Sequence, residues 1–517
     1  MSRTRRREAA AAGGIEVVWP GKYDARGRRV RPRVEAASLQ PSEHHGASPP
    51  AHDNLLVHGD NLAVLQALLA QHRGAVDLVY MDPPFATGTA FELALPVHVP
   101  GAGASTLRTP AFDDRWPSGA AFLDMLAPRL ERIHALLAPH GSLYVHVDPT
   151  RAHAVKLLLD EIFGADAFQR EIVWRIGWVS GFKTRARNWI RNHDTILFYA
   201  RDPARLRFHK VYVPHPPGYV RRKGTPGRVD GIAIDDVWNA GAADLALSGA
   251  DALDSIQIKS FSREKTGYAT QKNASLLRRI LAASSAPGEL VLDPFCGAGT
   301  TAAVALAMGR RFLAIDRGAA AIQLARARLL REQPQASWSL LQTEPPIELP
   351  LQCTRTGGGV VVRTPADAPG PAVALQLEPG RDVTRVRVLS VALGPAVDAA
   401  AAQQVAAGAD PLLELGVAWD ADPAAPYRAD TLRLATAEAA IDRELLGPAR
   451  ARGCAIVQLV DLDFRRVQLV VHWQRQARTL TVRGTMRVAA ASLHAAAPQP
   501  ARTLSPRAGS RGASRRA

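Results

Sequence analysis

Apolar residues between positions 54 and 332 follow two alternating spacings. Short apolar runs that end in polar residues predict strands, and apolar residues three or four positions apart predict the helices between them. The predicted strands lie within residues 54–61, 76–82, 141–148, 171–175, 192–201, 289–293 and 310–316, and the predicted helices within residues 62–69, 122–137, about 149–163, 276–281 and 302–308. This alternation is typical of an α/β fold.

The pattern changes after Pro334. Apolar and polar residues alternate at 384–388, 457–464 and 467–472, which predicts a separate α+β or mostly β domain over residues 345–490. Residues 1–50 and 491–517 are basic and rich in small residues, and we expect both to be tails, the first of them docked in part on the folded protein. Residues 51–340 form the predicted main domain, in which the long Gly-, Pro- and Thr-rich stretch 86–117 is expected to be a loop that acts as a lid or a flap.

One apolar run, 76–81, ends abruptly at Asp82. Asp82 is followed by Pro83, Pro84 and Phe85, and prolines cannot continue a sheet ladder, so the strand should stop with a carboxylate at its carboxyl end. In open α/β sheets ligands bind at that edge. The site suits the exocyclic amine of a flat base, because Asp82 and the Pro83 carbonyl can accept its two hydrogens while Phe85 stacks against the ring.

A second strand end of this kind lies further along the chain. A strand, a glycine turn and a helix follow one another over residues 289–308, and the next strand ends in an acid that can take both hydroxyls of a ribose. The residues predicted to hold a ligand here are Asp293, Phe295, Gly297, Gly299, Thr300 and Asp316. No lysine follows the glycines, as a phosphate-binding loop would require.

Together these motifs resemble those of the amino-group DNA methyltransferases. Asp82-Pro-Pro-Phe resembles the catalytic motif, and Asp293-Pro-Phe-Cys-Gly-Ala-Gly resembles the S-adenosylmethionine motif. The catalytic motif comes first in this chain, which resembles the circularly permuted beta class that contains many type III modification subunits and solitary adenine methylases. The resemblance covers about residues 54–332 and implies a Rossmann-like methyltransferase fold.

The same resemblance supplies further candidate residues. Asp60 and Asn61 resemble the Gly-Asp-Asn strand end that lies near the cofactor's adenine, and either of the two is also well placed as a helix N-cap. Lys272 stands in a Thr-Gln-Lys segment similar to the one that closes over the cofactor, with Asn273 where proline is usual. We therefore expect an S-adenosylmethionine-dependent enzyme that methylates adenine N6 in double-stranded DNA.

The net charge of +16 on 517 residues favours an anionic partner such as nucleic acid. Residues 203–266 lose periodicity and interleave Arg and Lys with aromatics, so we expect them to be the target-recognition insert, with Arg221, Arg222 and Lys223 as its most basic cluster. Three scattered cysteines offer neither a disulfide framework nor a metal site. No signal sequence or run of about 18 apolar residues is present, so we expect a cytoplasmic protein with no membrane partner.

Several alternatives stay open at this level. The acceptor could be cytosine N4, although Ser is common in those enzymes where Asp82 stands here. Related motifs also occur in RNA and protein-glutamine methyltransferases. A methyltransferase-like protein that binds DNA but does not methylate it is a further hypothesis. A homodimer and a restriction subunit are the additional partners that the resemblance implies, and no role is predicted for the C-terminal domain.

Overall fold

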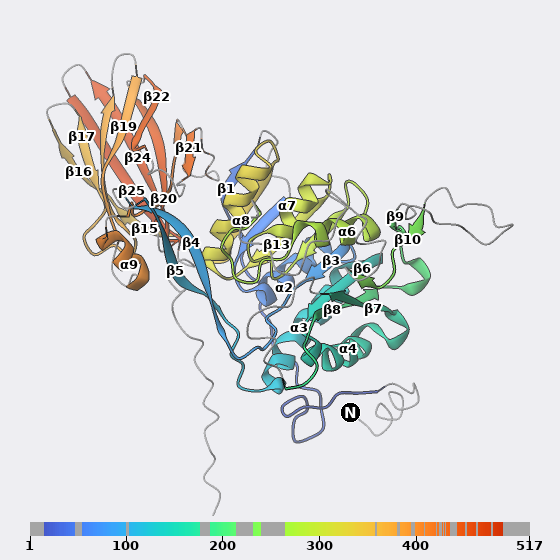
Figure 1. The fold of residues 1–517 in the computed structure, drawn as a ribbon. Helices are drawn as coiled ribbons and strands as arrows, with labels where there is room; N and C mark the ends of the chain where they lie inside the picture. The colour runs from blue at the N-terminus through green and yellow to red at the C-terminus, as the bar shows by residue number, and fades with distance from the viewer. Residues whose placement is uncertain are drawn as a thin grey trace, which may run out of the picture.

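The computed structural model describes residues 15–489, apart from 47–53, 100–102, 176–186, 214–230, 239–263 and short breaks at 357–358, 380–382, 394–398, 408, 420, 423–426, 428, 430, 435–441, 450–451, 462–463 and 477–478. The described residues form a mixed α/β domain and a β-rich domain beside it (Figure 1). Within this part of the chain no helix is long and apolar enough to cross a bilayer.

A ten-stranded sheet organises the first domain, in the order β1-β14-β2-β13-β12-β3-β6-β8-β7-β11. Its strands are β1 (Gln40–His45), β2 (Asn54–His58), β3 (Val76–Met81), β6 (Leu137–Val147), β7 (Phe168–Arg175), β8 (His193–Ala200), β11 (Val237–Trp238), β12 (Leu290–Asp293), β13 (Arg311–Asp316) and β14 (Trp338–Gln342). The central strands are parallel, whereas β8 runs antiparallel to both β6 and β7. The predicted α/β fold is confirmed.

Helices cover both faces of this sheet. On one face lie α2 (Asn61–His72), α3 (Gly119–Leu136) and α4 (Pro149–Phe163), and on the other α6 (Ala274–Ser284), α7 (Thr300–Ala307) and α8 (Ala319–Glu332). Successive residues of β3 alternate between the two cores, with Val79 in one and Tyr80 in the other. This double burial explains why the central strands are continuous apolar runs, and it brings their carboxyl ends to one edge.

The second domain is an antiparallel β sandwich. One sheet has the order β15-β25-β24-β23-β20-β21 and the other β16-β17-β18-β19-β22, and side chains from both sheets share a core. The strands are β15 (Ile347–Pro350), β16 (Gln352–Arg355), β17 (Val360–Arg363), β18 (Ala372–Pro379), β19 (Val383–Ala392), β20 (Leu412–Trp419), β21 (Thr431–Leu434), β22 (Glu444–Pro448), β23 (Arg452–Asp461), β24 (Arg466–Gln476) and β25 (Thr479–Val488), with helix α9 (Ala399–Ala406) between β19 and β20. The extra domain predicted to be α+β or mostly β is therefore mostly β.

The stretch 86–117 is not the loop that its composition predicted. Strands β4 (Ala90–Val99) and β5 (Gly103–Asp113) pair along their whole length as an antiparallel ribbon, which leaves the α/β domain and runs to the sandwich beside α9 (Figure 1). The side chains of Val97 and Leu107 are buried where it arrives. The composition misled because glycine and proline interrupt an otherwise alternating pattern.

The tail predicted for residues 1–50 also needs correction. Residues 40–45 form strand β1 on the edge of the large sheet, and buried Lys22 pairs with Glu161 of α4 at 2.7 Å. Glu43 is fully buried, and a carboxylate in that environment needs a partner. That partner is Arg326 of α8, so residues 40–45 belong to the folded structure.

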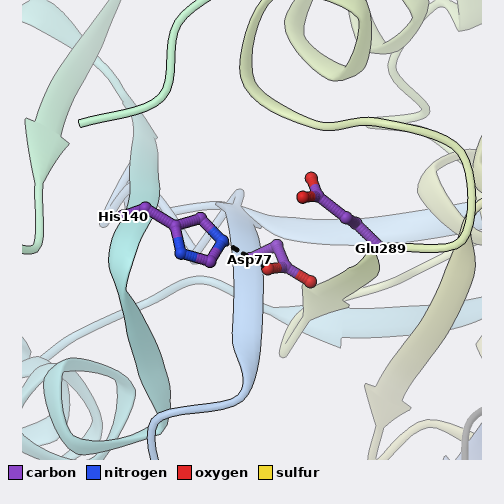
Figure 2. Close-up of side chains that lie close together, drawn as sticks. All are labelled: Asp77, His140 and Glu289. Atoms are coloured by element: carbon purple, nitrogen blue, oxygen red, sulfur yellow. Dashed lines mark hydrogen bonds and ion pairs between the residues drawn. The ribbon is translucent and has the colours of Figure 1, made fainter. Parts of the chain in front are cut away.

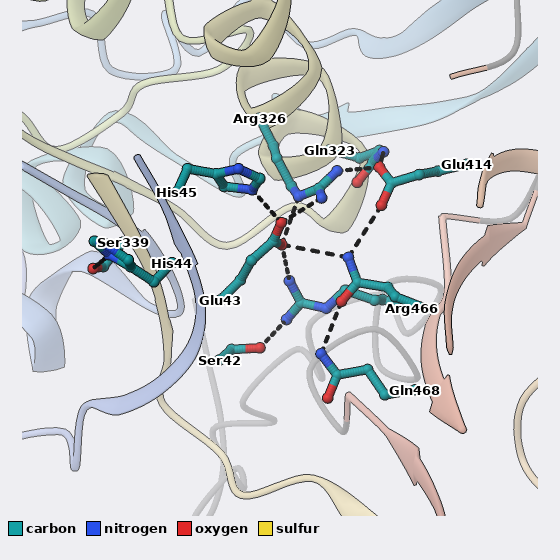
Figure 3. A network of polar contacts seen from close by, with 11 residues as sticks. Ser42, Glu43, His44, His45, Gln323, Arg326, Ser339, Glu414, Arg466 and Gln468 are labelled. Carbon is teal, nitrogen blue, oxygen red and sulfur yellow. Dashed lines mark hydrogen bonds and ion pairs between the residues drawn. The ribbon is translucent and has the colours of Figure 1, made fainter. Parts of the chain in front are cut away.

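Buried charges join β1, α8 and the sandwich (Figure 3). Arg326 contacts Glu43 and Glu414, and all three side chains are fully buried. Gln458 donates to Glu414 at 3.0 Å, and Arg466 lies 3.6 Å from Glu43. Burial alone would raise the pKa of Glu43, but the charges of Arg326 and His45 hold that pKa well below its usual range.

The predicted target-recognition insert is described only in part. Its described elements are a 3-10 turn at Pro203–Arg205, the paired strands β9 (Tyr212–Val213) and β10 (Ile232–Ala233), and β11 on the edge of the large sheet. The basic cluster of Arg221, Arg222 and Lys223 lies outside the described residues.

Candidate active site

One cavity gathers the residues that the two motifs contribute. It holds about 1190 Å³ of empty space, part of it open to solvent, at the carboxyl ends of the parallel strands. The predicted site residues that line it are Asp60, Asn61, Asp82, Pro83, Pro84, Phe85, Lys272, Asp293, Phe295, Gly297, Thr300 and Asp316. Segments more than 200 positions apart therefore meet because β12, which carries one motif, is the parallel neighbour of β3, which carries the other.

Asp82 follows β3 directly and is held by a cation. Its Oδ2 accepts a hydrogen bond of 2.5 Å from Lys272 Nζ, and the same ammonium lies 5.0 Å from the centre of the Phe85 ring. Its Oδ1 is buried and has no hydrogen-bond partner among the described residues. A buried acceptor without a donor is costly, which marks this oxygen as the place where a ligand N–H would bind.

The backbone after Phe85 is clamped in an unusual conformation. Ala86 has φ 56°, and the N–H groups of Ala86 and Thr87 donate to the Asp114 carboxylate at 2.9 and 3.0 Å. Asp114 is 1% exposed, so these bonds are shielded from water. The clamp restricts how far the acceptor motif can move.

The glycine loop is built around the buried carboxyl group of Asp293 and the half-buried carboxyl group of Asp316. Asp316 accepts from the N–H of Gly297 at 2.9 Å and of Gly318 at 2.8 Å, and Asp293 accepts from Phe295 N–H at 3.0 Å and Thr301 Oγ1 at 2.5 Å. Gly297 has φ 49°, in the left-handed region that favours glycine. Both acids thus order the loop as well as facing the cavity.

Burial shifts the titration of these two acids. It raises the pKa of Asp316, and it raises the pKa of Asp293 to about 7, with the charges of Asp82 and Asp316 adding to the effect. Acids outnumber cations on the lining of the cavity, which consists in part of the aspartates Asp60, Asp82, Asp114, Asp293 and Asp316 and the cations Arg129, Lys272 and Arg317. A cationic ligand fits this surface and a phosphate does not.

The end of β2 contributes an amide and an acid. Asn61 Nδ2 donates to the Pro294 carbonyl at 2.6 Å, and Asn61 Oδ1 accepts from Arg129 Nε at 2.5 Å. Arg129 also contacts Asp60 at 3.1 Å, while Asp60 caps α2 by accepting from Leu62 N–H at 2.9 Å. Of the two predicted N-cap candidates, Asp60 is the cap, and Asn61, the first residue of the helix, ties α2 to the glycine loop.

Lys272 lies between the acceptor motif and the glycine loop. Its ammonium lies on Asp82 and its carbonyl accepts the Thr300 hydroxyl at 3.2 Å, while the contact with the cofactor that the resemblance implied stays a prediction. One residue therefore connects the acceptor motif to the first turn of α7.

Gly299 does not line the cavity. It has φ 73°, and a Cβ added there would lie 2.7 Å from the Cβ of Ala325 in α8. Its role in the structure is to let α7 begin against α8.

Sequence reasoning missed a wall of aromatic side chains. Phe91 and Phe112 stack with their centroids 4.9 Å apart, Phe112 and Tyr268 follow at 6.0 Å, and all three line the cavity. Arg129 was missed as well. Phe91 and Phe112 come from the two strands of the ribbon, so only the alternating pattern within residues 90–99 and 103–113 could have identified them.

A histidine and two carboxylates meet at the opposite end of the sheet (Figure 2). His140 Nε2 lies 2.7 Å from Asp77 Oδ1, and Asp77 Oδ2 accepts from Leu290 N–H at 2.8 Å. Glu289 is paired with Arg207. Because these ligand atoms already have partners and a guanidinium adds positive charge beside them, we assign no metal here.

Comparisons with known proteins find DNA methyltransferases among the similar sequences. A family model described as DNA methylase matches residues 76–327. The type II methyltransferase M.EcaI of Enterobacter cloacae is 28% identical over 357 residues, which is 59% of this chain and 75% of that protein. The DNA adenine methyltransferase YhdJ of Escherichia coli K12 is 27% identical over 290 residues, 53% of this chain and 82% of that protein. The crystal structure of M1.HpyAVI with SAM is 17% identical, covers 53% of this chain and 98% of its own, and has a TM-score of 0.34.

Proposed function

We propose that this chain, whose residues 76–327 belong to the N6/N4 DNA methylase family, is an S-adenosylmethionine-dependent methyltransferase of the adenine N6 amine in DNA. One observation carries the proposal: Asp82, whose buried Oδ1 has no partner among the described residues, lines the same cavity as the Gly297 loop. Acceptor and donor sites must share one cavity, because direct transfer needs the reacting atoms about 3 Å apart.

The cavity fits the proposed cofactor chemically. S-adenosylmethionine carries an ammonium and a sulfonium, and when bound it supplies an electrophilic methyl group. The carboxyl groups of Asp82, Asp293 and Asp316 favour such a cation, and the rings of Phe295 and Tyr268 offer stacking faces. Asp60 and Asn61 are the polar groups that we assign to the adenosine end.

The chain's own groups then make the target amine nucleophilic. Asp82 Oδ1 accepts one N6 hydrogen and the Pro83 carbonyl accepts the other, which draws the nitrogen toward a tetrahedral geometry with its lone pair exposed. Phe85 stacks against the base once it has left the duplex. The interaction with Asp82 strengthens as the nitrogen gains positive charge, so it lowers the barrier more than it tightens ground-state binding.

Adenine is proposed over cytosine on two grounds. The acceptor residue is Asp82, whereas Ser is common in cytosine N4 enzymes, and one of the relatives is named as a DNA adenine methyltransferase. Cytosine N4 is the second candidate, since a cytosine amine would meet the same two acceptors.

Substitution of Asp82 by alanine separates chemistry from binding. Methylation should fall by about two orders of magnitude or more, while S-adenosylmethionine affinity measured by calorimetry stays close to that of the parent. Equal loss of cofactor affinity would show that the acceptor and cofactor roles are misassigned.

The edge of the sheet beside the acceptor motif presents a surface suited to DNA. The ring centroids of Phe85 and His146 lie 5.8 Å apart. His146 Nε2 lies 3.2 Å from Asp194 Oδ2, and Asp194 pairs with Arg191. Two positions before Arg191, the side chain of Trp189 is 98% exposed. An exposed aromatic flanked by arginine is the combination that binds unstacked bases and phosphates.

Two sets of variants test the DNA contacts. Trp189→Ala should weaken DNA binding and leave cofactor binding unchanged. Neutralising Arg221, Arg222 and Lys223 should weaken DNA binding and flatten its salt dependence, by about 0.9 in the slope of log affinity against log salt for each phosphate that the variant no longer neutralises. If the triple variant keeps the parent's affinity and slope, the insert does not face DNA.

Two further partners, a second copy of the chain and a restriction subunit, remain proposals that sedimentation analysis and co-purification would test.

A further inference from the structure

The ribbon begins as part of the acceptor site. The carboxylate of Asp114, directly after β5, holds the two residues that follow Phe85, and the Thr87 hydroxyl donates to it at 2.8 Å. The base of the ribbon and the catalytic motif therefore form one hydrogen-bonded unit around the buried Asp114 carboxylate.

The same end of the ribbon forms a wall of the cavity above the glycine loop. Phe112 stacks on Tyr268, and a Cβ added at Gly297 would lie only 3.1 Å from the Tyr268 ring. Ala94 N–H of β4 donates to the Gly267 carbonyl at 3.1 Å, so the ribbon also holds the segment that carries Tyr268. A shift of the ribbon would move the ring that lies over Gly297.

The far end of the ribbon is held by the sandwich domain. Val97 and Leu107, with Leu107 fully buried, share a small core with Ala401 of α9 and Ala409. Ser105 Oγ donates to Gln404 Oε1 at 3.0 Å. This end of the ribbon is packed on α9, whereas the composition of residues 86–117 had suggested a loop.

A second apolar cluster lies between the two ends. Leu93 of β4 packs with Ala298 of the glycine loop, Leu324 of α8 and Phe464 of the sandwich. Packed side chains therefore lead without interruption from α9, along the ribbon, to the cavity.

We propose that the C-terminal sandwich is a positioning part of the cofactor site: by holding the ribbon through α9, it sets Phe112 and Tyr268 over the Gly297 loop. The inference rests on the proposed function and gives a role to the domain that has no active-site motif of its own. None of the described residues of the sandwich lines the cavity. Its effect on the cavity passes through the ribbon.

A double-mutant cycle tests this connection. Leu107→Asp releases the ribbon at α9, Phe112→Ala removes the ring at the cavity, and Arg108→Ala, which changes an exposed neighbour on the same ribbon, is the control. S-adenosylmethionine affinity is measured by calorimetry on the full chain, with circular dichroism to check folding. Leu107→Asp and Phe112→Ala should each weaken S-adenosylmethionine affinity about tenfold. The double variant should bind no more weakly than the weaker of these two single variants. The control should change the affinity less than about twofold.

The outcomes separate the inference from the proposed function. If Leu107→Asp keeps the parent's affinity, or if the two losses multiply, the ribbon does not transmit support from the sandwich. If Leu107→Asp does not fold, the milder Leu107→Ala takes its place in the cycle with the same expectation. A parent protein that binds no S-adenosylmethionine would contradict the proposed function itself.

Discussion

Replacing Arg326 with methionine should reveal how strongly the two domains are joined. The guanidinium contacts Glu43 of β1 and Glu414 of the sandwich, and no part of the three side chains reaches solvent. Methionine fills similar space but leaves two carboxylates without their main cation. Breaking a buried ion pair by removing one partner costs about 3–5 kcal/mol. Glu43 keeps Arg466 and Glu414 keeps Gln458, so we expect a loss near the lower limit, about 3 kcal/mol.

The assay is urea unfolding, followed by far-ultraviolet circular dichroism and tryptophan fluorescence. Arg331→Met is the matched control, because Arg331 lies on the same helix, is 57% exposed and pairs only with its neighbour Glu332 among the described residues. A surface pair of this kind is worth about 0–1 kcal/mol. Adding Glu43→Gln and Glu414→Gln to Arg326→Met should recover much of the loss, because the uncompensated charges are then gone.

The contribution of Glu43 to folding stability should decrease at low pH. The pKa of Glu43 is lowered in the folded state, so its contribution to stability is complete above the unfolded pKa of about 4.3 and is lost as the pH falls below it. If Arg326→Met is no less stable than Arg331→Met to within about 1 kcal/mol, the network does not join the domains as described.

Three further predictions concern the cavity. Lys272→Ala removes the cation that orients Asp82. The methylation rate constant in single-turnover assays should fall about 10- to 100-fold, with little change in cofactor affinity. A large loss of cofactor affinity with a normal rate constant would show instead that Lys272 acts in cofactor binding. Burial raises the pKa of Asp293 to about 7, so binding of the cationic cofactor should release protons, and its affinity should weaken as the pH falls below about 7. Calorimetry on Asp293→Asn should show a flatter dependence of affinity on pH. Identical pH profiles of the parent and the variant would exclude Asp293 as the titrating group. Gly299→Ala places a methyl group 2.7 Å from Ala325 and strains a left-handed residue, so the free energy of unfolding should fall by about 2 kcal/mol, whereas an unchanged urea midpoint would mean that the loop relaxes freely.

Much of the α/β domain could be predicted from the sequence because its signals are local. The strand that ends at Asp82 is an apolar run closed by two prolines, and the loop at Gly297 is a strand, a glycine turn and a helix in sequence order. Parallel strands then bring both ends to one edge of the sheet, so the cavity follows from the motifs and the fold class together.

The parts that were missed depend on distant partners. Glu43 looks like one acid in a basic tail until Arg326, 283 positions away, is placed beside it. Lys272 binds an acid 190 positions away, and no local pattern distinguishes that contact from one with the cofactor. The ribbon is long and alternating, but it packs on residues near position 401, and its prolines and glycines favoured a loop on composition alone.

The most direct test of the central proposal is to follow the methyl group. Purified protein is incubated with duplex DNA and S-adenosylmethionine labelled in its methyl group, and the DNA is then digested to nucleosides and separated, with Asp82→Ala as the control. We predict that the label appears in N6-methyl-2′-deoxyadenosine from the parent and not from the variant. Label found only in N4-methylcytosine would contradict the choice of adenine, and DNA without label from a protein that binds the cofactor would contradict DNA methylation itself.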